Sequence, residues 1–258
     1  MIPKTIHYCW FGGNPKPKSV IKCIESWRKK CPGYEIIEWN ESNYDVTRNR
    51  YMKEAYHEKK WAFVSDYARF DIVYRHGGVY LDTDVELIRT LDPLLDCNAY
   101  FGFQFDQTIN PGLGFGSEPE NKLLKSLLEK YNSISFYNAD RSLNLTPITD
   151  LLAPVFEDYG FELNNRFQNI RGIIVYPTEY FDPMDHWTGF IIKSRRTVSI
   201  HHYHASWYPD YKKKQRKIMR RNGRLFFIKT IPNRLLRKLL GERRYESLKR
   251  TLKKTENN

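Results

Sequence analysis

Residues 74–84 read YRHGGVYLDTD, and this stretch decides the fold class. The apolar spacing of residues 59–76 predicts a helix, and the glycine pair at 77–78 predicts its end. Residues 79–81 are apolar, so we expect a short buried strand that runs directly into the two acids closing the stretch. A helix followed at once by a buried strand is typical of α/β proteins.

The residues around this stretch continue the alternation of strands and helices. Residues 4–10, 18–30 and 34–39 predict a strand, a helix and a strand, the βαβ unit of a parallel sheet. Further strands are predicted near 100–105, 172–176 and 197–203, and further helices over 119–131 and 148–158. We therefore expect one α/β domain over residues 1–210, with a mostly parallel sheet flanked by helices. A basic helical extension is expected over residues 211–258.

Composition excludes several classes of protein. The chain has 258 residues, 41% of them hydrophobic, which is enough for a substantial core and excludes a wholly disordered chain. No apolar run approaches the roughly 20 residues of a membrane span. The N-terminus lacks the basic and apolar segments of a secretion signal, which favours a cytoplasmic location. The four cysteines show neither paired nor zinc-finger spacing, so we expect reduced thiols.

The positive charge of the chain is concentrated at its C-terminal end. Residues 211–258 contain 18 Lys and Arg against three Asp and Glu, a net charge of +15, so residues 1–210 carry −3 of the total +12. Within this tail, Pro232 and Gly241 bound a predicted helix with leucines on one face at positions 235, 236, 239 and 240. A basic amphipathic helix suits an anionic membrane surface.

Two other interpretations of the tail stay open: a helix packed on its own domain with a solvated basic face, and a nucleic-acid patch. No zinc finger, RNP-like motif or Gly-rich RNA loop supports the latter, so we expect no nucleic-acid partner. The expected location is peripheral, at the inner face of the cell membrane.

Asp82 and Asp84 are the first candidate site. Side chains two apart on a strand share a face, and two neighbouring carboxylates are stabilised by a shared cation. Oxygen ligands favour Mn²⁺ or Mg²⁺, whose natural further ligand is a diphosphate. The plain alternative is a surface turn after an edge strand.

Two further groups add to this site. Asp66 and Arg69 lie three apart on the predicted helix and together suit a polyhydroxylated ligand, although they would also suit an ordinary ion pair within the helix. The segment HHYH at 201–204 offers imidazoles, of which His202 and His204 share a strand face. Histidines in the core or on the surface are the alternative there.

Four blocks, IPKTIHYCWFGG at 2–13, SDYARF at 65–70, YRHGGVYLDTD at 74–84 and HYHASW at 202–207, together resemble glycosyltransferase family 32. This DXD sugar-binding family includes capsular-polysaccharide glycosyltransferases, and its motifs are similar to those of glucosylating toxins. The resemblance covers roughly residues 1–210. It implies a GT-A-like, Rossmann-like fold with a mixed, mostly parallel sheet. It also implies a retaining hexosyltransferase that moves a hexose from a nucleotide sugar, by the family pattern a UDP-sugar, to a glycan acceptor. The implied acceptor is a polyprenyl-diphosphate-linked oligosaccharide or another glycan of capsule or surface-polysaccharide synthesis.

The resemblance also implies roles for single residues. Trp10 would stack on the base, Asp66 and Arg69 would hold the sugar, and Arg69 with the two acids of the DXD motif would be catalytic. Asp84 and Asp82 would bind the metal with His202, or with His204 if the register of the three histidines differs. The implied donor-binding residues are Trp10, Asp66, Arg69, Tyr80, Asp82, Asn110, Ser206 and Trp207.

Two other classes of protein remain as alternatives. An apolar strand ending in DxD also opens haloacid-dehalogenase-like phosphohydrolases, but Glu86 stands where that pattern expects Thr or Val. A non-enzymatic protein that binds membranes through residues 211–258 is the other.

Overall fold

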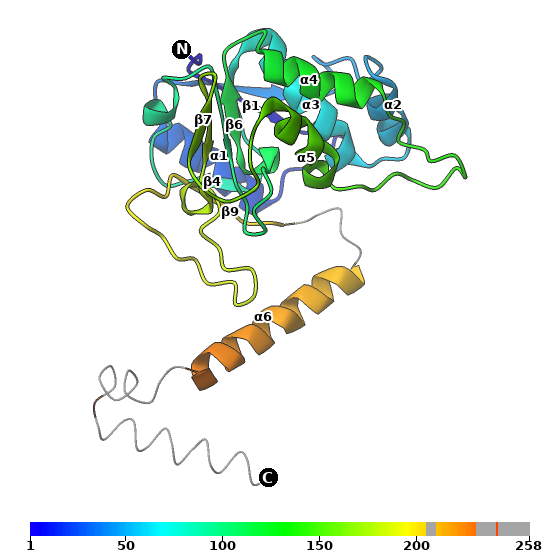
Figure 1. The fold of residues 1–258 in the computed structure, drawn as a ribbon. Helices are drawn as coiled ribbons and strands as arrows, with labels where there is room; N and C mark the ends of the chain where they lie inside the picture. Colours follow the sequence, from blue (N-terminus) through cyan, green and yellow to red (C-terminus); the bar gives the residue numbers. More distant parts are fainter. Residues whose placement is uncertain (205–209, 231–240, 242–258) are drawn as a thin grey trace. The chain divides into compact units, whose positions relative to one another are not determined.

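The computed structural model describes residues 1–204, 210–230 and 241. The chain forms two compact units, one of Met1–Asp185 with Ile191–Tyr208 and the other of His186–Phe190 with Pro209–Asn258. Figure 1 shows the course of the chain through the elements of both units.

A seven-stranded sheet organises the first unit, in the order β2-β1-β3-β6-β5-β8-β7. Strands β2, β1, β3, β5 and β8 point one way, and β6 and β7 oppose them. The sheet is therefore mixed and mostly parallel, as predicted. Its strands are β1 Thr5–Cys9, β2 Glu35–Trp39, β3 Gly78–Tyr80, β5 Ala99–Gly102, β6 Phe115–Ser117, β7 Gln168–Ile170 and β8 Ile173–Tyr176.

Helices cover both faces of this sheet because its strands alternate apolar side chains to either side. Ile6 and Val79 belong to the core cluster of α1, whereas Tyr80 and Phe101 belong to that of α2 to α5. The helices are α1 Lys18–Lys30, α2 Arg50–His57, α3 Trp61–His76, α4 Lys122–Asn132 and α5 Ile148–Tyr159. Single 3₁₀ turns lie at η1 Asp92–Leu94, η2 Pro111–Leu113 and η3 Thr178–Tyr180.

A separate two-stranded ribbon joins β4, Val85–Leu87, to β9, Ser199–His201. Helix α1 holds this ribbon through two side chains. The Trp27 indole Nε1 donates to the Val85 carbonyl at 2.7 Å, and the Leu87 amide donates to the Ser26 hydroxyl at 2.9 Å. The ribbon thus pairs the segment that directly follows the two acids with the distant segment that contains the histidines.

Most predicted elements are present, with several differences. The helix predicted over 18–30 is α1 itself, and the helix predicted over 59–76 is α3, which ends before Gly77. Helix α2 and strands β4, β6 and β7 were not predicted. The expectation that Asp82 and Asp84 lie on a strand face is wrong, because both lie in the turn between β3 and β4.

The described part of the second unit contains helix α6, Asp210–Thr230. The helix predicted between Pro232 and Gly241 lies in residues that are not described, apart from Gly241 itself. None of the helices over the described residues has the length and apolar character that crossing a bilayer needs.

Candidate metal and donor site

The two acids of the DXD motif lie at the carboxyl edge of the sheet. Strands β2 and β3 flank β1 on opposite sides, so the loops that follow β1 and β3 run in opposite directions along the sheet. The carboxyl ends of β1 and β3 are therefore the point at which the strand order reverses. Open α/β sheets bind ligands outside the carboxyl ends of strands at such points. Asp82 and Asp84 follow β3 in a turn closed by the Val85 amide, which donates to the Asp82 carbonyl at 3.0 Å.

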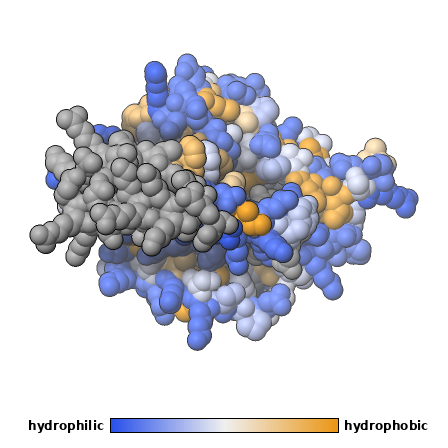
Figure 2. All heavy atoms as spheres, turned by 90° about the horizontal axis from the view of Figure 1, so that it is seen from below, coloured by the Kyte–Doolittle hydropathy of each residue, from blue (hydrophilic) through white to orange (hydrophobic). Residues whose placement is uncertain are grey.

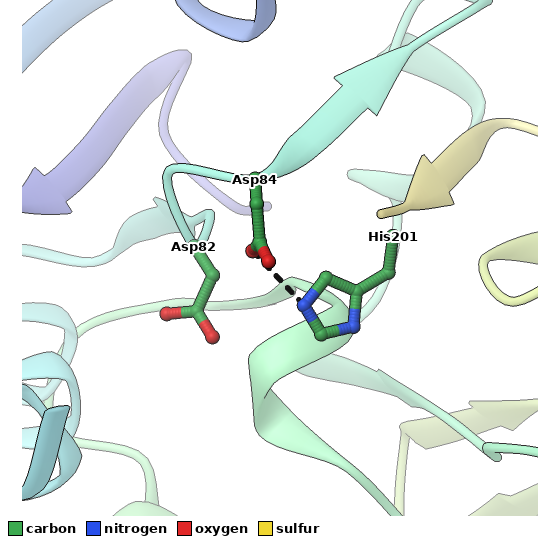
Figure 3. Close-up of side chains that lie close together, drawn as sticks. All are labelled: Asp82, Asp84 and His201. Carbon is green, nitrogen blue, oxygen red and sulfur yellow. Dashed lines mark hydrogen bonds and ion pairs between the residues drawn. The ribbon is translucent and has the colours of Figure 1, made fainter. Parts of the chain in front are cut away.

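Strand β9 brings an imidazole to this turn. In the antiparallel ribbon Val85 pairs with His201, which places the histidine beside the acids although it lies 117 residues away in sequence. The Asp84 carboxylate lies 3.0 Å from His201 Nε2 and also accepts a hydrogen bond from the His204 amide at 2.8 Å. Figure 3 shows Asp84 directed at His201, with Asp82 beside them.

The histidine that reaches the acids differs from the predicted one. His202 turns away from Asp84 and bonds the Glu86 carboxylate at 2.9 Å, and His204 meets Asp84 through its backbone amide. The expectation of His202 or His204 as metal ligand therefore needs correction, because β9 ends at His201 and, among these histidines, the ring of His201 offers its nitrogen beside the two acids. His201 is the residue on the face of the acids.

Arg69 links the acids to helix α3. Its guanidinium contacts Asp66 Oδ1 at 2.9 Å and Asp82 Oδ1 at 3.2 Å, and its Nε donates to the Ser65 carbonyl. The Tyr80 ring lies 5.0 Å from the guanidinium, a cation–π contact. Arg69 is only 3% exposed and Tyr80 1% exposed, so both support the site from beneath rather than offering a free face to a ligand.

Burial and charge set opposite protonation tendencies among these acids. Burial raises the pKa of Asp66 to about 6, and the nearby Arg69 offsets only part of this effect. Burial likewise raises the pKa of Asp82, against the charge of Arg69. Burial alone would also raise the pKa of Asp84, but the charge and hydrogen bond of His201 hold it well below its usual range. Asp84 is therefore the carboxylate that stays ionised most firmly.

The loop after β5 closes one side of the site. Asn110 accepts a hydrogen bond from the Gly112 amide at 2.7 Å and donates to the Gln104 side chain at 2.7 Å, which fixes the η2 turn. A Cβ on Gly112 would lie 2.7 Å from Asp82 Oδ2 and 3.0 Å from Asn110 Oδ1. The backbone therefore approaches Asp82 so closely that only glycine fits without displacing it.

Trp10 lies at the end of β1, at the same edge as the acids. Its indole donates to the Asn14 carbonyl at 2.6 Å, and the Lys16 ammonium lies 5.7 Å from the ring centre. Lys16 in turn pairs with Glu38, so the loop after β1 is internally bonded. Ser206 and Trp207, also expected to contact the donor, lie outside the described residues.

The donor set fits a divalent cation. Asp82, Asp84 and His201 each offer one ligand atom, and these atoms lie within 4.8 Å of one another. Two carboxylate oxygens and one imidazole are ligands that Mn²⁺ accepts readily and Mg²⁺ accepts in part.

Sequence reasoning also missed two residues beside this group. The centroids of the Tyr203 and His201 rings lie 3.9 Å apart. The Tyr203 hydroxyl donates a hydrogen bond to the Asp182 carboxylate at 2.8 Å. Asp182 is 2% exposed and accepts the Phe105 amide as well. Nothing local in the sequence marks Asp182, because its role depends on the packing of the segment after β8 against β9.

Part of this chain is similar in sequence to known proteins. Residues 17–101 match the family model described as a glycosyltransferase sugar-binding region containing a DXD motif. Inositol phosphoceramide mannosyltransferase 3 of Schizosaccharomyces pombe is 33% identical over 107 residues, 38% of this chain and 29% of that protein. Mannosyl phosphorylinositol ceramide synthase SUR1 of Saccharomyces cerevisiae is 31% identical over 107 residues, 39% of this chain and 27% of that protein. The chain thus aligns with less than a third of the length of each of these two relatives.

Solved glycosyltransferase structures are similar to it at low identity. PaToxG glycosyltransferase matches with a TM-score of 0.49 and 15% identity, over 61% of this chain and 69% of that chain. A glycosyltransferase involved in glycosylation of the major capsid of PBCV-1 matches with a TM-score of 0.45 and 14% identity, over 83% of this chain and 98% of that chain.

The family match contains the DXD motif and the Asp66–Arg69 pair of α3, whereas the first block and the histidine block of the resemblance lie outside it. Residues 17–101 of this chain match the glycosyltransferase sugar-binding region that contains the DXD motif, so the family resemblance drawn from the sequence is confirmed over these residues.

Proposed function

We propose that this protein is a metal-dependent glycosyltransferase that moves a hexose from a nucleotide sugar, a UDP-sugar by preference, to a glycan acceptor. The observation that carries the proposal is the convergence of Asp82, Asp84 and His201 at the carboxyl edge of the sheet. The two acids lie within the matched sugar-binding region. Carboxylates and an imidazole in this arrangement suit a cation that binds a diphosphate.

The side chains of the site have distinct tasks in this proposal. Asp84 and His201, with Asp82, would hold the Mn²⁺ or Mg²⁺ ion. When bound, the cation would neutralise negative charge that develops on the departing nucleoside diphosphate. Arg69 fixes Asp82 through the 3.2 Å contact and adds positive potential beneath the site, so it acts as a positioning residue.

The remaining features of the reaction are proposed from the family resemblance. The acceptor hydroxyl attacks the anomeric carbon from the face that the leaving group vacates, so the configuration is retained and a diphosphate oxygen takes the proton. The proposed acceptor is a lipid-linked glycan of capsule or other surface polysaccharide, reached from the inner face of the cell membrane. The basic tail over residues 211–258 supports this location.

Hydrolysis or transfer of a panel of nucleotide sugars, with Mn²⁺, with Mg²⁺ and with a chelator, tests the proposal. We expect activity with at least one UDP-sugar, its loss on chelation, and a drop on the order of 100-fold in Asp84→Asn. Asp158→Asn is the matched control, since Asp158 is an exposed acid on α5. Full activity of Asp84→Asn, or phosphate release from simple phosphoesters without sugar transfer, would contradict the proposal.

A further inference from the structure

The second unit carries a cluster of aromatic side chains between the loop 186–190 and helix α6. The ring of Trp187 stacks on that of Phe226, with centroids 5.7 Å apart and planes 9° from parallel. The ring of Phe190 meets Phe227 edge-on, with centroids 5.8 Å apart. Such ring pairs stabilise the loop on the helix beyond their burial alone.

The helix is shaped to receive this loop. A Cβ on Gly223 would lie 2.0 Å from the Trp187 ring and 2.6 Å from the Trp187 carbonyl, so the loop rests on a notch that only glycine provides. Arg224 Nε donates to the Thr188 carbonyl at 2.6 Å, and its guanidinium lies 5.4 Å from the Phe190 ring. Residues 186–190 and α6 therefore form one packed element.

Packing leaves these rings largely open to solvent. Trp187 stays 56% exposed and Phe226 57% exposed, although they stack on each other. Further round the helix, Tyr211, Ile218 and Leu225 stand seven residues apart and form a second exposed apolar stripe. Exposed apolar surface of this extent marks a contact site. On the face drawn in Figure 2, small groups of hydrophobic residues lie among hydrophilic ones.

The charge of helix α6 indicates which class of partner its exposed surface would bind. Residues 211–230 contain nine Lys and Arg and no Asp or Glu, so the apolar side chains lie among cations only. A second copy of the same helix would be repelled by this charge. Proteins that bind single-stranded nucleic acid offer open aromatic faces on which the bases stack. Here Trp187 and Phe226 cover one face of each other. The other exposed apolar side chains of the helix include Ile218, Leu225 and Ile228, which are aliphatic and offer no ring for a base.

We infer that residues 186–190 and helix α6 together form a docking surface for an anionic lipid bilayer. The Trp187, Phe190 and Phe226 rings sit at the headgroup level, where aromatic rings are favoured, and the lysines and arginines meet lipid phosphates. The inference goes beyond a basic tail, because it assigns an insertion loop from the middle of the chain to the same surface. It deepens the proposed function, since a lipid-linked acceptor lies at such a bilayer.

Co-sedimentation of the full chain with vesicles tests the inference. We expect the wild type to bind vesicles of equal parts phosphatidylglycerol and phosphatidylcholine and to bind pure phosphatidylcholine at least about tenfold more weakly. The double variant Trp187→Ser/Phe190→Ser is expected to lose on the order of tenfold in binding to the anionic vesicles. Phe167→Ser is the matched control, because Phe167 is also 56% exposed but belongs to the first unit.

The outcomes separate this inference from the proposed function. Circular dichroism is to check that the variants are folded, and hydrolysis of the soluble donor is to be measured beside vesicle binding. Equal binding of the double variant and the wild type, equal binding to neutral and anionic vesicles, or tighter binding to single-stranded RNA than to anionic vesicles would overturn the docking surface. Vesicle binding without any donor hydrolysis would overturn the proposed function and leave the docking surface intact.

Discussion

At the scale of single residues, the site depends on which histidine faces the acids. His201 Nε2 lies 3.0 Å from the Asp84 carboxylate, whereas His202 bonds Glu86 on the other side of the ribbon. We expect His201→Ala to lower Mn²⁺-dependent donor hydrolysis on the order of 100-fold, because it removes a ligand atom. His202→Ala is the matched control and should retain most of the activity. A large loss in His202→Ala with normal turnover in His201→Ala would restore the ligand predicted from the sequence.

The backbone at Gly112 is a second point at which a single atom matters. A methyl group there would lie 2.7 Å from Asp82 Oδ2, so Gly112→Ala must push the carboxylate away from its place beside Arg69. A displacement of about 1 Å in a catalytic group costs on the order of 100-fold in rate, and we expect a loss approaching that size in kcat.

Gly33→Ala serves as the control for this variant, since a Cβ on Gly33 meets no atom within 4 Å. Its activity and its midpoint of urea unfolding should match those of the wild type. Unchanged kcat in Gly112→Ala would show that the turn around Asp82 yields without cost.

Among the helices and strands, α1 holds the β4–β9 ribbon in place through hydrogen bonds, and this ribbon positions the residues of the site. Trp27 is fully buried, and its indole donates to the Val85 carbonyl one residue after Asp84. Trp27→Phe leaves that carbonyl unpaired, so we expect a loss of about 1–3 kcal/mol in the free energy of unfolding, measured with urea. Tyr34→Phe removes an exposed hydrogen bond to Asp92 and should cost less. Equal costs for the two variants would show that α1 does not hold the ribbon.

The predictable elements are those with local signals. Pro17 and the spacing of apolar residues fix α1, and Gly77 fixes the end of α3. Strands β4 and β9 are three residues each and pair across more than 110 positions, so no local pattern marks their register. The sequence therefore identifies Asp82 and Asp84 but not the histidine that joins them. Helix α2 was missed although Asn49 caps it, a signal that the sequence does contain.

His7 joins three elements and makes their packing depend on pH. Its Nε2 lies 2.9 Å from the Gly77 carbonyl after α3, and its Nδ1 lies 3.1 Å from the indole nitrogen of Trp39 on β2. The indole can only donate, so Nδ1 accepts and the ring is neutral. Burial lowers the pKa of His7 to about 4 from the usual 6.5, with only partial compensation from the Gly77 hydrogen bond.

The sign of the effect on stability follows from proton binding. Between about pH 4 and 6.5 the unfolded chain binds a proton at this histidine that the folded chain does not, so folding stability is lost as the pH falls through this window. The full effect is roughly 3 kcal/mol. Urea unfolding at several pH values should show this slope in the wild type and a flatter one in His7→Gln, which keeps a donor for Gly77. Parallel curves for the two proteins would contradict this assignment.

At the scale of the whole molecule, charge and chemistry are divided between different parts of the chain. Residues 1–210 carry a net charge of −3 and contain the DXD site, whereas residues 211–258 carry +15. A near-neutral body keeps non-specific attraction low around a site whose own acids are already paired with Arg69 and His201. In the proposed docking, attraction to an anionic surface would therefore come from residues 211–258.

This division predicts how binding to anionic vesicles responds to salt. Between about 0.05 M and 0.5 M salt the Debye length falls from more than 10 Å to about 4 Å, so the contribution of the cations shrinks while that of the inserted rings remains. The triple variant Lys214→Gln/Lys217→Gln/Arg221→Gln removes three of the nine cations of residues 211–230 and should show both weaker binding at low salt and a shallower dependence on salt. Lys18→Gln/Lys22→Gln/Lys29→Gln removes the same charge from exposed positions on α1 and should keep the wild-type slope. If the α1 variant lost as much binding as the α6 variant, net charge alone would hold the protein on the bilayer, and the placement of the cations around the aromatic rings would be irrelevant.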